Sequence, residues 1–94
     1  MATESFSNTP TAILARLIVP EEPSLSPDAA RSLLRSRFSE HDRQRMQELL
    51  AKAKDATLSV EEAQEAEAYD HIGHLLALLQ SKARLSLKRS GLTP

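Results

Sequence analysis

The chain has 94 residues, which is enough for one small domain and too few for two independent hydrophobic cores. It contains no cysteine, no tryptophan, one tyrosine and two phenylalanines. This composition excludes a disulfide scaffold, a thiolate zinc site and an aromatic platform for single-stranded nucleic acid. Twelve basic and thirteen acidic residues give a net charge of −1, so no strong field attracts DNA or a membrane surface. The sequence has neither a signal-peptide pattern at its start nor an apolar run long enough to span a membrane, so we expect a cytoplasmic protein.

The N-terminal part predicts a flexible start and one short apolar segment. Residues 1–10 are polar, and we expect them to be flexible. Thr9 and Pro10 are typical of a helix start, with threonine as the N-cap and proline at the first helical position. The apolar segment 11–19 that follows is either a short helix or an extended piece, and Pro20 ends it.

Capping signals predict three principal helices after this segment. Ser26 and Ser39 are typical N-caps, and residues 59–62 (SVEE) form a capping box. Apolar residues recur at helical spacing behind each start. The predicted helices cover residues 27–37, 40–54 and 60–88. We therefore expect an all-α fold with a single helical domain over 11–88, a hairpin or bundle completed by oligomerisation, and a flexible C-terminus at 89–94.

The last predicted helix carries more apolar surface than its neighbours can obviously cover. A seam with alternating spacings of three and four and a second stripe beside it together cover about 200° of the helix, against about 100° for a surface helix. We therefore predict that this surface binds a second copy or another protein, with a homodimer favoured. The predicted partner-binding residues are Tyr69, Ile72, Leu75, Leu76, Leu78, Leu79, Ala83 and Leu85.

Charges are sorted along the same helix. Residues 61–70 include five acids and no base, and residues 82–89 include four bases and no acid. This order compensates the helix macrodipole. It also suits an antiparallel second helix, whose basic half would lie along the acidic half of the first. The two interpretations are compatible.

The sequence offers little for catalysis. Glu67, His71 and His74 share one side of the last predicted helix and could present a carboxylate and two imidazoles to a metal. Two histidines at this spacing are more often solvated, so we predict no metal and no cofactor. No serine has His and Asp partners at a recognised spacing, so we expect that the protein is not an enzyme.

The arginines of the middle helices offer an alternative function in nucleic-acid binding. Arginines can contact phosphates without aromatic partners. These arginines are interleaved with acids, however, which is more typical of a solvated face with local ion pairs. The residues of this alternative are Arg31, Arg35, Arg37, Arg43 and Arg45.

Five blocks form a recognisable series, namely 16–20 (RLIVP), 25–31 (LSPDAAR), 38–46 (FSEHDRQRM), 56–59 (ATLS) and 73–87 (GHLLALLQSKARLSL). The series spans about residues 13–88 and resembles a family of short, uncharacterised bacterial α-helical proteins. Members are often encoded beside a small HNH endonuclease, so the resemblance implies an antitoxin-like or accessory partner of such a nuclease, without catalytic residues. At Ala56 the sequence departs from the family pattern, which has glycine at the end of that helix. We therefore predict a protein-interaction module that associates through its last helix.

Overall fold

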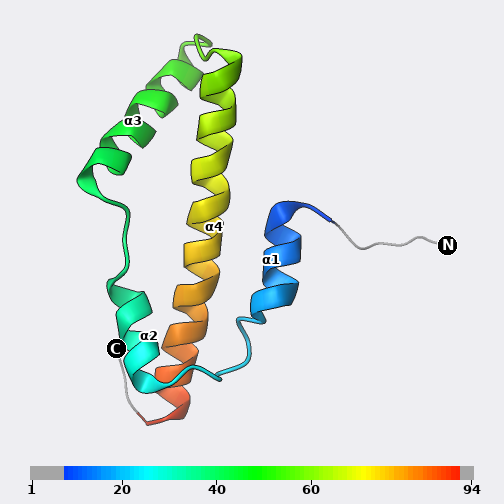
Figure 1. Cartoon of the computed structure of the whole chain (residues 1–94), viewed down its shortest axis with the longest axis vertical. Helices are drawn as coiled ribbons and strands as arrows, with labels where there is room; N and C mark the ends of the chain where they lie inside the picture. The colour runs from blue at the N-terminus through cyan, green and yellow to red at the C-terminus, as the bar shows by residue number, and fades with distance from the viewer. Residues whose placement is uncertain (1–7, 92–94) are drawn as a thin grey trace, which may run out of the picture. The chain divides into compact units, whose positions relative to one another are not determined.

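A computed structural model describes residues 8–91 and has four helices and no strand over that range (Figure 1). The all-α prediction is therefore confirmed. Helix α1 covers Pro10–Ile18, where the sequence left helix and strand open. The three principal helices begin within one residue of the predicted starts and are α2 (Pro27–Arg35), α3 (Glu40–Lys54) and α4 (Val60–Arg89).

Each helix begins at the capping residue that the sequence indicated. The hydroxyls of Thr9, Ser26 and Ser39 each accept a hydrogen bond from the N–H three residues on, at 3.1–3.2 Å. At the start of α4, the Glu62 N–H donates to the Ser59 hydroxyl at 3.0 Å, and the Ser59 N–H donates to the Glu62 carboxylate at 3.1 Å. This is the reciprocal capping box that the sequence predicted.

Helix α2 ends two residues earlier than predicted, because a residue distant in sequence takes up its final carbonyls. Ser36 already has an extended backbone, with ψ at 133°. The Gln80 side-chain amide donates to the carbonyls of Leu33 and Ser36 at 3.1 and 2.9 Å. These bonds satisfy acceptors that another helical turn would otherwise have used.

The described residues fall into two compact units that share α4. The first unit joins the residues up to Ser36 with those from His74 onward, and the second is Arg37–Gly73. The single domain over 11–88 stays a prediction. The predicted flexible ends, 1–10 and 89–94, lie mostly outside the described residues; of the rest, Thr9 and Pro10 start α1 and Arg89 ends α4.

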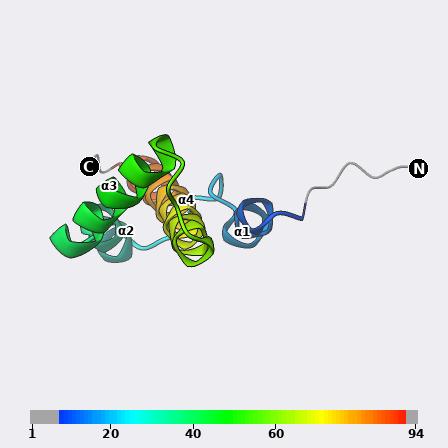
Figure 2. The same ribbon diagram turned by 90° about the horizontal axis from the view of Figure 1, so that it is seen from above.

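In the first unit, α1 and α2 lie on different sides of the C-terminal half of α4 (Figures 1 and 2). The buried core consists of Ala30, Ala83 and Leu87, with three leucines of the α2 region packed against it. On the side of α1, the Lys82 ammonium donates to the Ile18 carbonyl at 2.7 Å. No residue of α1 is fully buried.

A buried hydroxyl joins the segment before α2 to α4 in the same unit. Ser86 is 1% exposed. Its hydroxyl accepts from the Leu25 N–H at 3.1 Å and donates to the Lys82 carbonyl at 2.8 Å. Both polar functions of the hydroxyl are therefore satisfied inside the core.

The second unit is a hairpin of α3 and the first half of α4, joined by a short turn (Figure 1). Its fully buried hydrophobic side chain among the described residues is Leu49. At the turn, Ala56 has φ at 57° and the Thr57 N–H donates back to the Lys52 carbonyl at 2.9 Å. Ala56 thus occupies the left-handed position at the helix end, where glycine is the usual residue.

The strain at this turn gives a first testable prediction. An L-residue other than glycine in the left-handed region costs roughly 1–2 kcal/mol, part of which glycine loses again through its greater freedom in the unfolded chain. We expect Ala56→Gly to raise the free energy of unfolding by about 0.5–1 kcal/mol. Urea unfolding followed by circular dichroism measures the change. Ala51→Gly, inside α3, should instead lower stability by about 1 kcal/mol, and a loss of stability in both variants would contradict the account.

Candidate protein-interaction site

An open apolar groove lies between α3 and the first half of α4 in the second unit. Its volume is about 360 Å³. Leu50 is 57% exposed there, while Gln47 and Asp70 add polar groups to the lining. The apolar lining residues are Met46, Leu49, Leu50, Ala53, Ala66 and Tyr69.

The α4 side of the groove combines one small residue, Ala66, with the larger Tyr69 and Asp70. Leu49 is only 3% exposed and fills the space between the helices. Leu50, the next residue, has Ala66 as an α4 neighbour in the lining, and an alanine methyl is too short to cover it. Full burial of a leucine is worth roughly 1.5–3 kcal/mol. A partner that covers Leu50 would therefore gain substantially.

Tyr69 has its orientation fixed at the side of this groove. Its hydroxyl donates to an Asp42 carboxylate oxygen at 2.7 Å, and its ring meets Phe38 edge to face at a centroid distance of 6.1 Å. The hydrogen bond lowers the pKa of Asp42, with a smaller contribution from Ser39, and raises that of Tyr69. A second hollow of about 320 Å³ borders Tyr69, and Ile72 in its lining is 51% exposed.

Arg45 on α3 joins the two helices of the hairpin through a carboxylate network. Its guanidinium makes a two-point contact with Glu65 at 2.7 and 2.8 Å and a further contact with Glu48 at 3.0 Å. The Lys52 ammonium donates to Glu62 at 2.6 Å. Hydrogen bonds from Lys52 and then from the Ser59 N–H lower the pKa of Glu62 to about 2. The network aligns α3 with α4 and so keeps the walls of the groove in place.

The shifted Glu62 predicts a loss of stability in acid. Its pKa falls from 4.5 in the unfolded chain to about 2 in the folded one, so the unfolded chain takes up the proton first as the pH falls. The stabilisation is therefore present above pH 4.5 and is lost between about 4.5 and 2. Thermal unfolding across this window should show Glu62→Gln with a flatter pH dependence than the unaltered chain.

The control is Glu61→Gln, which removes the neighbouring exposed carboxylate. Among residues 8–91 Glu61 makes no ion pair, so its removal should leave the slope of melting temperature against pH unchanged. Equal slopes for Glu62→Gln and the unaltered chain would show that the Glu62 contacts do not stabilise the hairpin.

Most of the predicted partner-binding residues are half-buried in the structure. Ala83 is buried, and Ile72 is the member of the set that is mostly exposed, at 51%. The leucines of the predicted set lie in the first unit, and each of them is half-buried. The half-buried members are Tyr69, Leu75, Leu76, Leu78, Leu79 and Leu85.

The residues that the sequence reasoning missed lie on α3. One face of α3 carries apolar residues at helical spacing, namely Met46, Leu49, Leu50 and Ala53. The sequence did not predict this face as a partner-binding surface. The available signal was Ala66, a small residue on the α4 side of the groove. A small alanine side chain opposite a leucine leaves part of the space between the two helices unfilled.

The arginines of the nucleic-acid alternative are divided between the two units and partly paired. Arg31 contacts Asp28 at 3.4 Å, Arg43 contacts Glu40 at 2.9 Å, and Arg45 belongs to the hairpin network. Among residues 8–91, Arg35 and Arg37 are exposed without an ion pair. Neither unit by itself therefore brings all five arginines together.

The two histidines that the sequence predicts to be solvated lie in different units. His71 is near the end of the second unit, and His74 begins the C-terminal segment of the first unit. His71 is half-buried and His74 is exposed. Over residues 8–91, no group of three or more His, Cys, Asp or Glu side chains is arranged to hold a metal ion. The absence of a metal and of a cofactor stays a prediction.

Comparisons with family models, with curated proteins and with solved structures give no match for this chain. Within the part of the chain that the structure describes, no helix has both the length and the apolar character of a membrane span.

Proposed function

We propose that this chain is a cytoplasmic protein-interaction module that forms a homodimer through the groove of the α3–α4 hairpin. The observation that carries the proposal is Leu50, 57% exposed beside an apolar groove of about 360 Å³. Two helices alone leave an apolar face uncovered, and a second copy is the simplest partner that completes a bundle. The proposal retains the prediction that the chain associates through its last helix, because α4 supplies one wall of the groove.

A second exposed apolar side chain in the same unit supports the proposal. Ile72 is 51% exposed and borders the smaller hollow beside Tyr69. Exposed apolar side chains that gather around hollows mark interaction surfaces more often than isolated ones do. The interaction surface is thus expected on both sides of Tyr69.

The experiment is a charge placed in the groove. Leu50→Glu should raise the dissociation constant of the dimer by at least about tenfold, because association would bury an unpaired carboxylate. Analytical ultracentrifugation measures the constant, and circular dichroism checks that the helices are retained. The matched control is Leu17→Glu on α1, where the leucine is 75% exposed and lies outside the groove. Equal weakening by the two substitutions would contradict the proposal.

The family resemblance adds a small HNH endonuclease as a second proposed partner. An antitoxin-like role requires that the chain binds the nuclease and changes its activity. Titration of a small HNH endonuclease with this protein, read out as DNA cleavage, tests the role. Cleavage that is unchanged at saturating protein would remove the nuclease from the proposal and leave self-association standing.

A further inference from the structure

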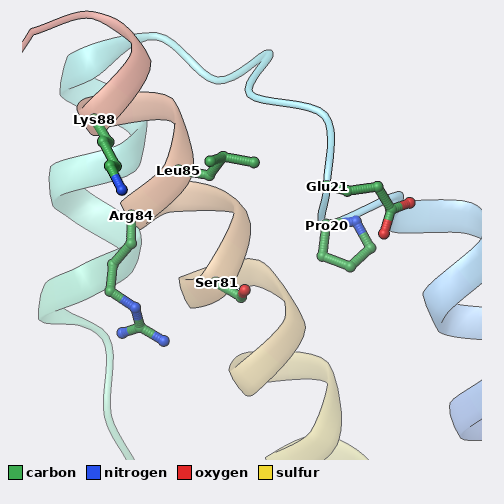
Figure 3. Close-up of a pocket in the computed structure, with 6 residues that line it drawn as sticks. All are labelled: Pro20, Glu21, Ser81, Arg84, Leu85 and Lys88. Atoms are coloured by element: carbon green, nitrogen blue, oxygen red, sulfur yellow. The ribbon is translucent and has the colours of Figure 1, made fainter.

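The first unit contains an open cleft between α4 and the connection that joins α1 to α2 (Figure 3). Its volume is about 400 Å³. Small-molecule sites in proteins have volumes of roughly 300–1,000 Å³, so the cleft has room for a compact ligand. The lining residues are Pro20 and Glu21 on the side of the connection and Ser81, Arg84, Leu85 and Lys88 on α4.

Hydrogen bonds to α4 hold the connection in place at both of its ends. At one end the Lys82 ammonium donates to the Ile18 carbonyl at 2.7 Å. At the other end the Leu25 N–H donates to the buried Ser86 hydroxyl at 3.1 Å. Lys82 and Ser86 lie on either side of Arg84 along α4. The two walls of the cleft are therefore positioned before a ligand arrives, which reduces the entropy that binding costs.

Three polar side chains of the α4 wall have donors available for a ligand. Ser81, Arg84 and Lys88 are spaced by three and four residues, which places them on one face of the helix, and all three are exposed. Figure 3 shows Arg84 and Lys88 one turn apart, while the Glu21 carboxylate is turned away from both. Among residues 8–91, neither Arg84 nor Lys88 makes an ion pair.

The charge of the first unit favours an anion in this cleft. Residues 8–36 and 74–91 include seven bases and three acids, although the whole chain has a net charge of −1. Arg84 and Lys88 repel each other, and an anion between them removes this repulsion. Guanidinium, ammonium and hydroxyl groups are the donors that bind phosphoryl oxygens. The α4 wall is therefore suited to a phosphoryl group with two negative charges.

We propose that this cleft binds a small phosphate monoester. Arg84 and Lys88 contact the phosphoryl oxygens, and the Ser81 hydroxyl donates a further hydrogen bond. The organic part of the ligand lies against Leu85, which Figure 3 shows directed toward Pro20. These two apolar residues distinguish an ester from inorganic phosphate, because only the ester gains from covering them. The site lies in the first unit, so it is independent of the proposed self-association through the groove of the second unit.

Acidic residues on the opposite side favour a small monoester over a nucleic acid. Glu21 lines the cleft, and Glu22 beside it is exposed. A nucleic acid that crosses the cleft would bring further phosphates toward these carboxylates, and like charges repel each other. A ligand with a single phosphoryl group keeps its charge on the α4 wall.

Titration calorimetry with phenyl phosphate in a phosphate-free buffer tests the proposal. Phenyl phosphate combines a phosphoryl group with an apolar ring, so it addresses both parts of the cleft. We expect a dissociation constant of about 1 mM or below. Arg84→Gln with Lys88→Gln should raise this constant at least about tenfold, because it removes both charges and retains much of the length of the side chains. Circular dichroism checks that the variant is helical.

The control variant is Arg35→Gln with Arg89→Gln, which removes two exposed charges from the same unit outside the lining and should bind as the unaltered chain does. Equal weakening by the two double variants would show a general attraction of anions and overturn the proposal. The absence of binding to the unaltered chain at about 10 mM phenyl phosphate would also overturn it. If a DNA duplex binds more tightly than phenyl phosphate and the variant of Arg84 and Lys88 loses that binding, the cleft is a nucleic-acid contact and the proposed ligand is wrong.

Discussion

Leu87→Ala is expected to lower the free energy of unfolding by about 2–5 kcal/mol, because it leaves a cavity in a core with few other large side chains. Leu87 is 1% exposed and packs with Ala30 and Ala83, two residues that cannot rearrange to fill the space. A chain of this size has a total stability of roughly 5–15 kcal/mol, so the variant would lose a large part of it. Urea unfolding monitored by circular dichroism measures the loss.

The matched control for this prediction is Leu17→Ala. Leu17 is 75% exposed, so its truncation should change stability by no more than about 0.5 kcal/mol. Similar unfolding midpoints for the two variants would show that the α2–α4 contact is not the main source of stability in the first unit.

Ser86→Ala is expected to cost about 1–3 kcal/mol, although it removes one oxygen atom and leaves the volume of the core almost unchanged. The cost comes from the Leu25 N–H, which donates to the Ser86 hydroxyl at 3.1 Å and would lose its acceptor. Ser81→Ala on the exposed side of α4 is the control and should be nearly neutral. If Ser86→Ala unfolds at the same urea concentration as the control, water replaces the hydroxyl and the segment before α2 is not anchored by it.

The helix positions were predictable because the signals that set them are local. A capping hydroxyl acts on an N–H three residues away, as Ser26 does on Ala29 at 3.2 Å. Proline at 10 and 27 occupies a first helical position that needs no N–H donor. Such contacts lie within one helical turn, so they can be read directly from the order of residues.

The contacts that assemble the first unit were not predictable in the same way. Lys82 contacts the Ile18 carbonyl across 64 residues, and Gln80 contacts Leu33 across 47. A lysine and a glutamine on a helix are ordinarily solvated, and their spacing does not indicate a backbone partner. These contacts connect α1 and α2 to α4. The leucines of residues 75–85, which the sequence assigns to an apolar surplus, are half-buried in the structure.

The sequence predicted that the last helix takes part in binding. It did not predict which part of that helix borders the candidate site. Tyr69 and Ile72 belong both to the predicted partner-binding set and to the hollows of the second unit. The exposed Leu50 was not predicted, because its exposure depends on which residues of α4 lie across the groove from it. Periodicity shows that a residue faces a neighbouring helix, and only the pairing of residues across that contact shows whether the space is filled.

The oligomeric state of the unaltered chain tests the central claim most directly. Sedimentation equilibrium over a concentration series through the micromolar range gives the mass without altering any residue of the groove. We predict a reversible rise from the mass of one chain to that of two, because the exposed groove residues gain cover only in the dimer. A mass that stays at one chain throughout the series, with the helices intact by circular dichroism, would contradict the account.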